Sequence, residues 1–296
     1  MANDDRARDQ AWARKLPARV AREAIVCGVF DTIIRSYARK RIDGREHLDR
    51  LDGPAIFVAN HCSHVDTPLL LRSLPRAVRR RTAVAAAADY FYTSRLLAGA
   101  VSLAFCTVPL ERRGGGRGGS TASLQPLIDD GWSLVVFAEG TRSRDGRVAP
   151  LRTGAAMLAA AHGLPLVPIH IAGTHAAMPT GRGWMVRPAG GRRFARHELR
   201  VCFGAPIEVG PRDDRFEVME RVRQFMEACG AVTSPDPKLA ARRAAAAAGS
   251  AGVDEAAAPV APAAPGPTAT GAPAVRAAST GGAAAPARVA ESRSLR

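Results

Sequence analysis

Hydrophobic positions near the start of the chain follow a helical period. Between Arg19 and Arg41, apolar side chains recur at i, i+3, i+4 and i+7, which is one face of an α-helix; they are Val26, Val29, Phe30, Ile33, Ile34 and Tyr37. Basic residues flank this face at Arg19, Arg22, Arg35, Arg39, Lys40 and Arg41. Such a helix either lies on an anionic membrane interface or packs against its own domain. The sequence leaves both interpretations open.

Short apolar runs and helical patterns alternate through the rest of the body. Buried strands are expected at Ala55–Ala59, Thr82–Ala86, Thr107–Leu110, Leu134–Phe137, Leu166–Ile171 and Leu199–Phe203. Helices are expected between them at Thr67–Leu74, Ser94–Leu103, Ala122–Asp129, Gly154–His162 and Asp214–Cys229. This alternation predicts an α/β fold with a mostly parallel sheet flanked by helices. Pro168 lies inside a strand pattern and predicts a bulge or a sheet edge.

Two apolar stretches have to be weighed as membrane spans. Leu96–Leu110 carries no charge but is shorter than the ~20 residues that a spanning helix needs. The second stretch, Thr153–Thr174, is interrupted by Pro165 and Pro168. We therefore expect no transmembrane helix, although Leu96–Ala104 is suited to dip into a membrane surface. The residues after Met1 are polar, which predicts no cleaved signal peptide.

The composition changes near Pro235. Residues 237–296 consist mainly of Ala, Pro, Gly and Ser, with almost no aromatic or large aliphatic side chains. Such a segment cannot offset the entropy lost on ordering, so we expect a disordered tail in which only Arg242–Ala248 is able to form a transient helix. The predicted organisation is a basic amphipathic helix over residues 1–45, a catalytic domain over 46–232 and the tail over 233–296.

The chain is strongly basic, with 42 Lys+Arg against 27 Asp+Glu and a net charge of +15. Only Lys15, Lys40 and Lys238 are lysines, so part of the charge reflects an Arg-rich codon bias, which is typical of a GC-rich, here expected bacterial, genome. The remainder indicates an anionic partner. A nucleic-acid partner is disfavoured because only 5% of the residues are aromatic and no recognised binding motif is present. Five Cys without CxxC spacing exclude a disulfide scaffold, a zinc ribbon and a redox pair.

The first candidate site directly follows the Ala55–Ala59 strand and reads Asn-His-Cys-Ser-His-Val-Asp, residues 60–66. Ligands in α/β folds bind where such strands end. His61 and Asp66 can meet only if His61 lies in the turn and Asp66 in the first helical turn, with Ser63 as the cap. The pair would then act as a general base and the carboxylate that orients it. The alternative is a helix-capping Asp66 beside a buried histidine.

A metal site at His61, His64 and Asp66 is disfavoured, since the sequence offers no later His cluster to supply the remaining ligands. We therefore expect no metal ligands, and we expect His64 to be a loop side chain.

Two further stretches carry groups suited to an anionic ligand. Phe-Ala-Glu-Gly-Thr-Arg-Ser, residues 137–143, follows the Leu134–Phe137 strand and offers two hydroxyls and the fork of Arg142. Arg112 stands at the end of the Thr107–Leu110 strand, before a glycine-rich run that matches no phosphate-loop pattern. The alternatives are a solvated loop and a flexible glycine linker.

These stretches together resemble the conserved blocks of glycerolipid acyltransferases of the lysophosphatidate acyltransferase type. NHCSHVD resembles the family's NHx(S)xxD block, PLER at residues 109–112 its second block, FAEGTRS its FPEGTRS block, and VPI at 167–169 its fourth. The four blocks occur in the family's order, and the resemblance runs from about Arg41 to about Cys229. Ala138 replaces the usual Pro, and Glu111 stands where Asp or Asn is commoner, which leaves Arg113 as a rival of Arg112.

The resemblance implies transfer of a fatty acyl group from an acyl thioester, either acyl-CoA or acyl carrier protein, to the hydroxyl of lysophosphatidate. Because an alcohol is a poor nucleophile, a base must remove its proton during attack. His61 would be that base and Asp66 would orient it. A covalent intermediate on Cys62 is disfavoured because the acceptor alcohol attacks directly. No metal or prosthetic group is needed.

The family pattern assigns binding of the acceptor's phosphate and glycerol to Arg112, Glu139, Gly140, Thr141 and Arg142. Since Glu139 cannot pair with phosphate, we expect it to orient Arg112 or Arg142 or to bind an acceptor hydroxyl. The donors of the oxyanion hole are left open.

Two kinds of alternative function remain: acyl transfer to a different acceptor, and a protein without catalytic activity. The acceptor could instead be another lysophospholipid, a lyso-ornithine-type lipid or glycerol 3-phosphate. A non-catalytic membrane adaptor is a different class, which the intact His61 and Asp66 disfavour. The expected partners are the acyl donor, the lysolipid and an anionic membrane surface, and the expected location is the cytoplasmic face of the cell membrane, peripheral or monotopic.

Overall fold

The computed structural model describes residues 11–87, 95–110, 124–190 and 194–254. The chain divides into two compact units, Met1–Ala245 and Ala246–Arg296, and the sheet and the candidate site belong to the first. The strands are β1 (Ala38–Asp43), β2 (Ile56–Ala59), β3 (Thr82–Ala87), β4 (Thr107–Leu110), β5 (Ser133–Phe137), β6 (Leu166–Ala172) and β7 (His197–Phe203). The main helices are α2 (Leu16–Ala24), α3 (Asp31–Tyr37), α4 (Asp66–Ser73), α5 (Arg76–Arg79), α7 (Arg95–Phe105), α8 (Gln125–Asp129), α9 (Gly154–His162), α10 (Thr174–Ala177), α11 (Arg215–Ala228) and α12 (Pro237–Asp254).

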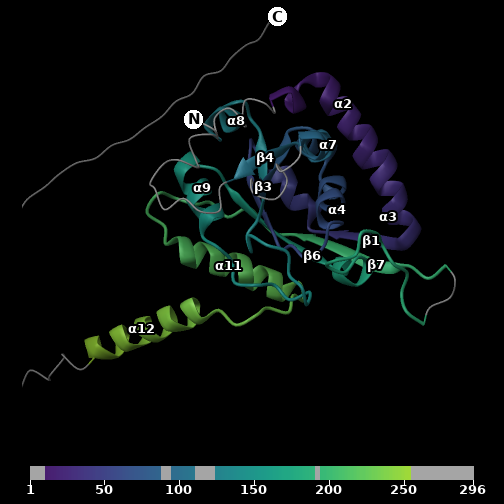
Figure 1. The fold of residues 1–296 in the computed structure, drawn as a ribbon. Coiled ribbons are helices and arrows are strands. Elements are labelled where there is room, and N and C mark those ends of the chain that lie inside the picture. Colours follow the sequence, from purple (N-terminus) through teal and green to yellow (C-terminus); the bar gives the residue numbers. More distant parts are fainter. Residues whose placement is uncertain (1–10, 88–94, 111–123, 191–193, 255–296) are drawn as a thin grey trace, which may run out of the picture. The chain divides into compact units, whose positions relative to one another are not determined.

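The strands form one seven-stranded sheet in the order β1-β7-β6-β2-β5-β3-β4. Neighbouring strands are parallel except for β6 and β7, which are antiparallel. Helices cover both faces, as Figure 1 shows, with α9 and α11 on one side and α2, α3 and α4 on the other. The predicted α/β class with a mostly parallel sheet is confirmed.

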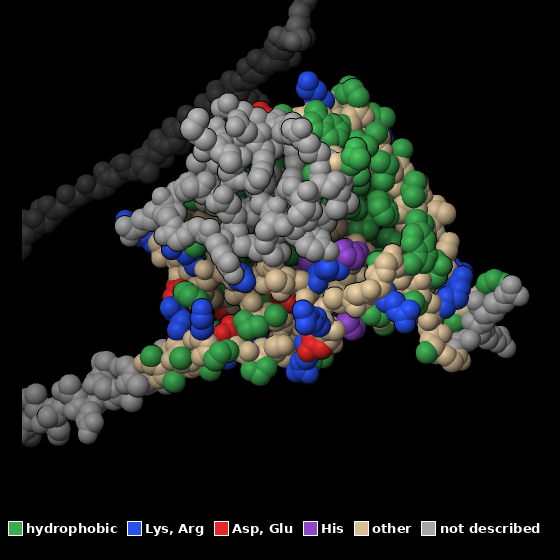
Figure 2. Space-filling model, in the orientation of Figure 1, with side chains coloured by type: hydrophobic (Ala, Val, Ile, Leu, Met, Phe, Trp, Pro, Cys, Tyr) green, Lys and Arg blue, Asp and Glu red, His purple; other side chains and the backbone are tan. Residues whose placement is uncertain are grey.

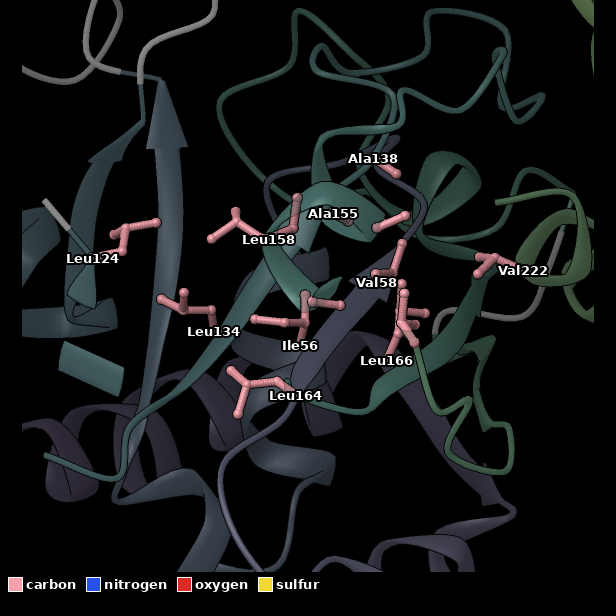
Figure 3. Close-up of a cluster of buried hydrophobic side chains, with 14 of the residues drawn as sticks. Ile56, Val58, Leu124, Leu134, Ala138, Ala155, Leu158, Leu164, Leu166 and Val222 are labelled. Atoms are coloured by element: carbon pink, nitrogen blue, oxygen red, sulfur yellow. The ribbon is translucent and has the colours of Figure 1, made fainter. Parts of the chain in front are cut away.

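Two hydrophobic clusters fill the two sides of the sheet because side chains alternate along each strand. Ile56 and Val58 belong to the cluster with α8, α9 and α11, and Phe57 belongs to the cluster with α4 and the N-terminal helices. In Figure 3, Ile56, Leu134 and Leu166 from three adjoining strands lie close to Leu158 of α9. Both faces of β2 are fully buried, which explains its uninterrupted apolar run.

The N-terminal segment is helical as predicted, but the helix is shorter than predicted. Helical residues run through α2, a π-helical stretch over Ile25–Phe30, and α3. The helix then ends at Tyr37, and Ala38–Asp43 forms the edge strand β1 instead of its last turn. The predicted apolar face packs mainly inward, since Val26 and Ile34 are buried in the core.

Charged side chains attach this segment to the domain. The buried Arg22 donates to the carbonyls of Leu103 (3.0 Å) and Ala13 (2.6 Å). Glu23 accepts two hydrogen bonds from Arg79 of α5, and that pairing lowers the pKa of Glu23. Asp31 pairs with Lys40 of β1 at 2.7 Å. These contacts support the interpretation that this face of the helix packs on its own domain.

Pro168 lies in the interior of the sheet, so the expectation of a sheet edge is wrong. Strand β6 is paired on both sides, with β2 and with β7. The ladder with β7 ends at Ile169 and Phe203, and the next bridge joins Leu166 to Ile207. Two residues on one side oppose three on the other, which is the bulge that the proline predicted.

A helix, α12, occupies part of the segment expected to be a tail. It is longer than the Arg242–Ala248 stretch that we expected to form a transient helix. Asp236 accepts hydrogen bonds from the amides of Lys238 and Leu239 at its start, and Ala and Arg have high helix propensity. Arg242 also forms an ion pair with Asp214. Residues 255–296 lie outside the described part of the chain.

The buried His170 of β6 predicts a loss of stability on acidification. Burial lowers the pKa of His170 to about 4, and its Nδ1 has no hydrogen-bond partner in the described part of the chain. The unfolded chain binds this proton below the ordinary histidine pKa of 6.5, whereas the native state remains neutral down to about pH 4. Stability from this group is therefore lost as the pH falls from 6.5 towards 4, by at most about 3 kcal/mol. Urea unfolding at several pH values should measure this loss.

The matched variant for this prediction is His170→Asn, which has no titratable group. Glu139 acts with the opposite sign, because burial raises its pKa to about 7 and the native state gains a proton there as the pH falls. Only the difference between the two proteins therefore isolates His170. The same pH dependence in His170→Asn would assign the effect to other groups.

Candidate active site

The candidate site lies at the carboxyl ends of three adjoining strands. Ala59, the last residue of β2, is in register with Phe137 of β5 and with Ile169 of β6. The 60–66 loop and the 138–143 turn therefore leave the sheet side by side, at the edge where α/β proteins bind ligands.

Asp66 fixes His61 and the loop between them. One oxygen, Oδ2, accepts hydrogen bonds from His61 Nδ1 at 2.8 Å, Cys62 N at 2.7 Å and Ser63 N at 2.8 Å. The Asp66 side chain is fully buried, and its Oδ1 accepts no hydrogen bond from the described residues. With Nδ1 donating to the carboxylate, a neutral His61 carries its lone pair on Nε2. The structure thus brings together the two residues that the sequence paired.

The helix begins differently from the sequence expectation. Asp66 is the first residue of α4, Val65 precedes it, and Ser63 is not the cap. Instead, the Asp66 carboxylate reaches back to the amides of the loop. A carboxylate in the first turn is also favoured by the helix dipole.

Phe137 stacks against one face of the His61 ring and orients it. The two rings stack with their centroids 4.1 Å apart and an interplanar angle of 20°. The His61 side chain keeps 19% of its surface exposed, so the ring is held on one side and accessible on another. No pattern in the sequence predicted this role, although Phe137 stands within the FAEGTRS block.

Glu139 supports the His61 loop from the neighbouring strand. Its Oε1 accepts from His61 N at 2.7 Å and its Oε2 accepts from Ala149 N at 2.9 Å. Burial raises the pKa of Glu139 to about 7, although the two amides favour the carboxylate. Both carboxylate oxygens of Glu139 thus accept hydrogen bonds from backbone amides. This differs from the expected contact with an arginine or an acceptor hydroxyl.

Distant segments hold the rest of the loop. Both amide atoms of Asn60 bond the backbone of Ile171, at 2.9 and 2.8 Å. Ser63 Oγ donates to Met178 O at 2.9 Å, and Thr180 Oγ1 donates to Ser143 O at 2.9 Å. Ser143 N in turn donates to His61 O at 2.8 Å. The His61 loop is therefore a rigid part of the fold, and the sequence carried no periodic signal for these supports.

The other predicted binding residues surround the same turn. Gly140 adopts a left-handed φ of +76°, and Thr141 is exposed. Arg142 contacts His64 Nε2; burial and then the Arg142 charge lower the pKa of His64, so a neutral ring accepts from the guanidinium. Arg112 and its rival Arg113 lie outside the described residues. In the part of the chain that the structure describes, no three His, Cys, Asp or Glu side chains converge as metal ligands.

Cys62 is unsuited to nucleophilic attack despite its place beside His61. Its side chain is buried, Sγ lies 3.2 Å from Thr174 Oγ1, and burial followed by the Asp66 charge raises the thiol pKa to about 12. The reactive species of a cysteine is its thiolate, so we expect Cys62→Ala to leave kcat within roughly fivefold of the wild type. Steady-state rates and a melting curve should be measured together. A kcat loss as large as that expected for His61→Ala, in a folded variant, would restore the acyl-cysteine scheme.

The fold and this site define a class of protein: an α/β domain with a His–Asp pair and a glycine turn at the carboxyl edge of its sheet. Residues 39–172 match the family model described as Acyltransferase. This segment of the chain is therefore similar to the acyltransferase family.

Individual relatives show the same similarity. The chain is 34% identical over 151 residues to a chloroplastic 1-acyl-sn-glycerol-3-phosphate acyltransferase of Brassica napus, covering 50% of this chain and 41% of that protein. A probable enzyme of the same name from Mycoplasma genitalium is 24% identical, with 52% and 56% covered. The chain spans less than half the length of the Brassica protein.

A solved structure extends the likeness further along the chain. The crystal structure of the 1-acyl-sn-glycerophosphate acyltransferase PlsC from Thermotoga maritima superimposes with a TM-score of 0.53 and 25% identity. The likeness covers 77% of this chain and 86% of that one. The shared fold thus includes more than the segment matched by the family model.

Proposed function

We propose that this protein is a lysophosphatidate acyltransferase, which moves a fatty acyl group from an acyl thioester to the free hydroxyl of 1-acylglycerol 3-phosphate to give phosphatidate. The observation that carries this proposal is the His61–Asp66 pair, joined by the 2.8 Å contact of Nδ1 and Oδ2 and held beside the glycine turn. The printed names of the relatives support the choice of acceptor.

In the proposed mechanism, His61 Nε2 removes the proton of the acceptor hydroxyl as its oxygen attacks the thioester carbonyl. Asp66 stabilises the resulting imidazolium, and the stacked Phe137 ring keeps the imidazole plane fixed. The imidazolium then returns its proton to the departing thiolate. No enzyme nucleophile, metal or prosthetic group takes part; acyl-CoA or acyl carrier protein serves as co-substrate.

A matrix of donors and acceptors tests this function. Purified protein is incubated with oleoyl-CoA or oleoyl-acyl carrier protein and with lysophosphatidate, another lysophospholipid, a lyso-ornithine lipid or glycerol 3-phosphate. Mass spectrometry of the products should show phosphatidate at the highest rate. A faster reaction with another acceptor would move the assignment to that lipid, and no product with any acceptor would favour a membrane adaptor.

We further propose that the protein acts on a membrane surface through an exposed apolar stripe. The stripe consists of Trp12, Leu16, Val20 and Val29 of the N-terminal helices, with Leu16 61% and Val20 56% exposed. Hydrophobic side chains gather over this helical region in Figure 2, beside histidine and basic side chains. No helix among the described residues is long and apolar enough to cross a bilayer. An in-plane helix with a basic margin suits an anionic interface.

Charges placed on this stripe are expected to weaken membrane binding. Leu16→Glu with Val20→Glu should reduce co-sedimentation with phosphatidylglycerol vesicles several-fold, because two apolar anchors are lost and like charges are added. The control is Met157→Glu, which adds an acidic group to α9 on the other face of the sheet. Equal vesicle binding by all three proteins would contradict the assignment of this surface.

A further inference from the structure

A short segment after the EGTRS turn is fixed beside it by backbone hydrogen bonds. Ala149 N donates to Glu139 Oε2, and Arg152 N donates to Ala138 O, both at 2.9 Å. Ala138 itself belongs to the buried cluster shown in Figure 3. The backbone of Arg152 is therefore anchored to the end of β5.

The side chain of Arg152 rests on the glycine of this turn. A Cβ placed on Gly140 would lie 2.8 Å from Arg152 Nε and 3.1 Å from Cζ. Such distances are closer than van der Waals contact, so the guanidinium occupies the space that a side chain at position 140 would fill. Gly140 thus has two reasons to be glycine: its positive φ and this contact.

Other charged groups of this turn and of the loop that follows it already have partners within the protein. Glu139 accepts from two backbone amides. Asp145 accepts from Ser143 Oγ and Arg147 N, and Arg147 donates to Thr233 O. Among the described residues, Arg152 has no hydrogen bond or ion pair through its guanidinium, and the side chain is exposed. A fork of N–H donors is thus held at the turn with its hydrogen-bonding capacity unused.

We propose that Arg152 binds the phosphate of the acceptor lipid beside Arg142. This inference rests on the proposed function, since it names how the same site recognises lysophosphatidate. A planar guanidinium matches a phosphate with two parallel hydrogen bonds. Its contact with Gly140 orders the fork before the ligand arrives, which reduces the entropy lost on binding.

Arg144 is the matched control in the same loop. It carries the same charge and is also exposed, but among the described residues its side chain forms no hydrogen bond or ion pair, and Arg152 rather than Arg144 lies against Gly140. A nonspecific effect of loop charge should therefore appear equally in Arg144→Ala and Arg152→Ala. A specific phosphate contact should appear only in Arg152→Ala.

The test compares Arg152→Ala, Arg152→Lys and Arg144→Ala with the wild type on two acceptors that differ only in the phosphate. These are 1-oleoyl lysophosphatidate and 1-oleoylglycerol, the second measured as substrate or as competitive inhibitor. In Arg152→Ala, KM for lysophosphatidate should rise roughly tenfold or more, as for a lost charge-assisted hydrogen bond, with kcat little changed. The KM or inhibition constant for 1-oleoylglycerol should be unchanged. Arg152→Lys should have a KM for lysophosphatidate between those of Arg152→Ala and the wild type.

Two results would overturn the inference: a KM in Arg152→Ala equal to that in Arg144→Ala, or an equal rise for the acceptor without phosphate. A wild-type protein that acylates no lysophosphatidate would instead refute the proposed function. Equilibrium binding of lysophosphatidate to the wild type and Arg152→Ala requires no turnover, so it decides the role of Arg152 in either case.

Discussion

Replacement of His61 by alanine should lower kcat for acyl transfer by roughly 100- to 10,000-fold, the range that general base catalysis contributes. The alcohol then has to attack without a positioned group to accept its proton. Because His61 Nδ1 is only one of three donors to Asp66 Oδ2, the variant keeps the hydrogen bonds from the amides of Cys62 and Ser63 to that carboxylate. Folding and KM for the lysolipid should therefore stay close to wild type, as measured by a melting curve and initial rates.

Added imidazole provides the sharpest control for this variant. It should restore part of the rate to His61→Ala, in which the vacated space beside Phe137 can admit a free ring. It should not accelerate the wild type. Near-normal turnover in His61→Ala would remove His61 from the proton transfer, and another group would have to deprotonate the acceptor hydroxyl.

The sequence predicted the central strands well because their physical signal is local. Both faces of β2 are buried, so an apolar run marks it without ambiguity. Strand β1 gave no such signal: it reads Ala-Arg-Lys-Arg-Ile-Asp, lies at the sheet edge and has charged side chains. Charges suit an edge strand, since they discourage pairing with another chain. The same residues extend the basic margin of the preceding helix, and so the helical interpretation continued too far.

The site divides in the same way between local and distant determinants. His61 and Asp66 are five residues apart, and the spacing alone indicated where each must lie. The supports from Ile171 and Met178 come from more than 100 residues away, as backbone groups that any sequence would supply. Glu139 was expected to face ligand groups, but amides that no motif encodes are its partners.

After His61, the negative charge of Asp66 is expected to have the largest effect on kcat of the proposed acyl transfer. In Asp66→Asn, the amide oxygen can take the place of Oδ2 and accept the same three hydrogen bonds from His61, Cys62 and Ser63. The NH2 group then takes the place of Oδ1, which is buried and has no partner among the described residues. That unmet donor costs roughly 1–3 kcal/mol of stability. What disappears from the chemistry is the negative charge that stabilises the imidazolium.

We therefore expect kcat of Asp66→Asn to fall by roughly 100- to 10,000-fold while the protein remains folded. Asp66→Ala should be slower still or less stable, because the loop amides also lose their acceptor. Circular dichroism and melting curves for both variants separate loss of charge from loss of structure. A folded Asp66→Asn with wild-type kcat would show that Asp66 contributes only a hydrogen bond. Ordering of the imidazole by Asp66 and Phe137 would then be sufficient, and the proton transfer would not depend on a buried charge.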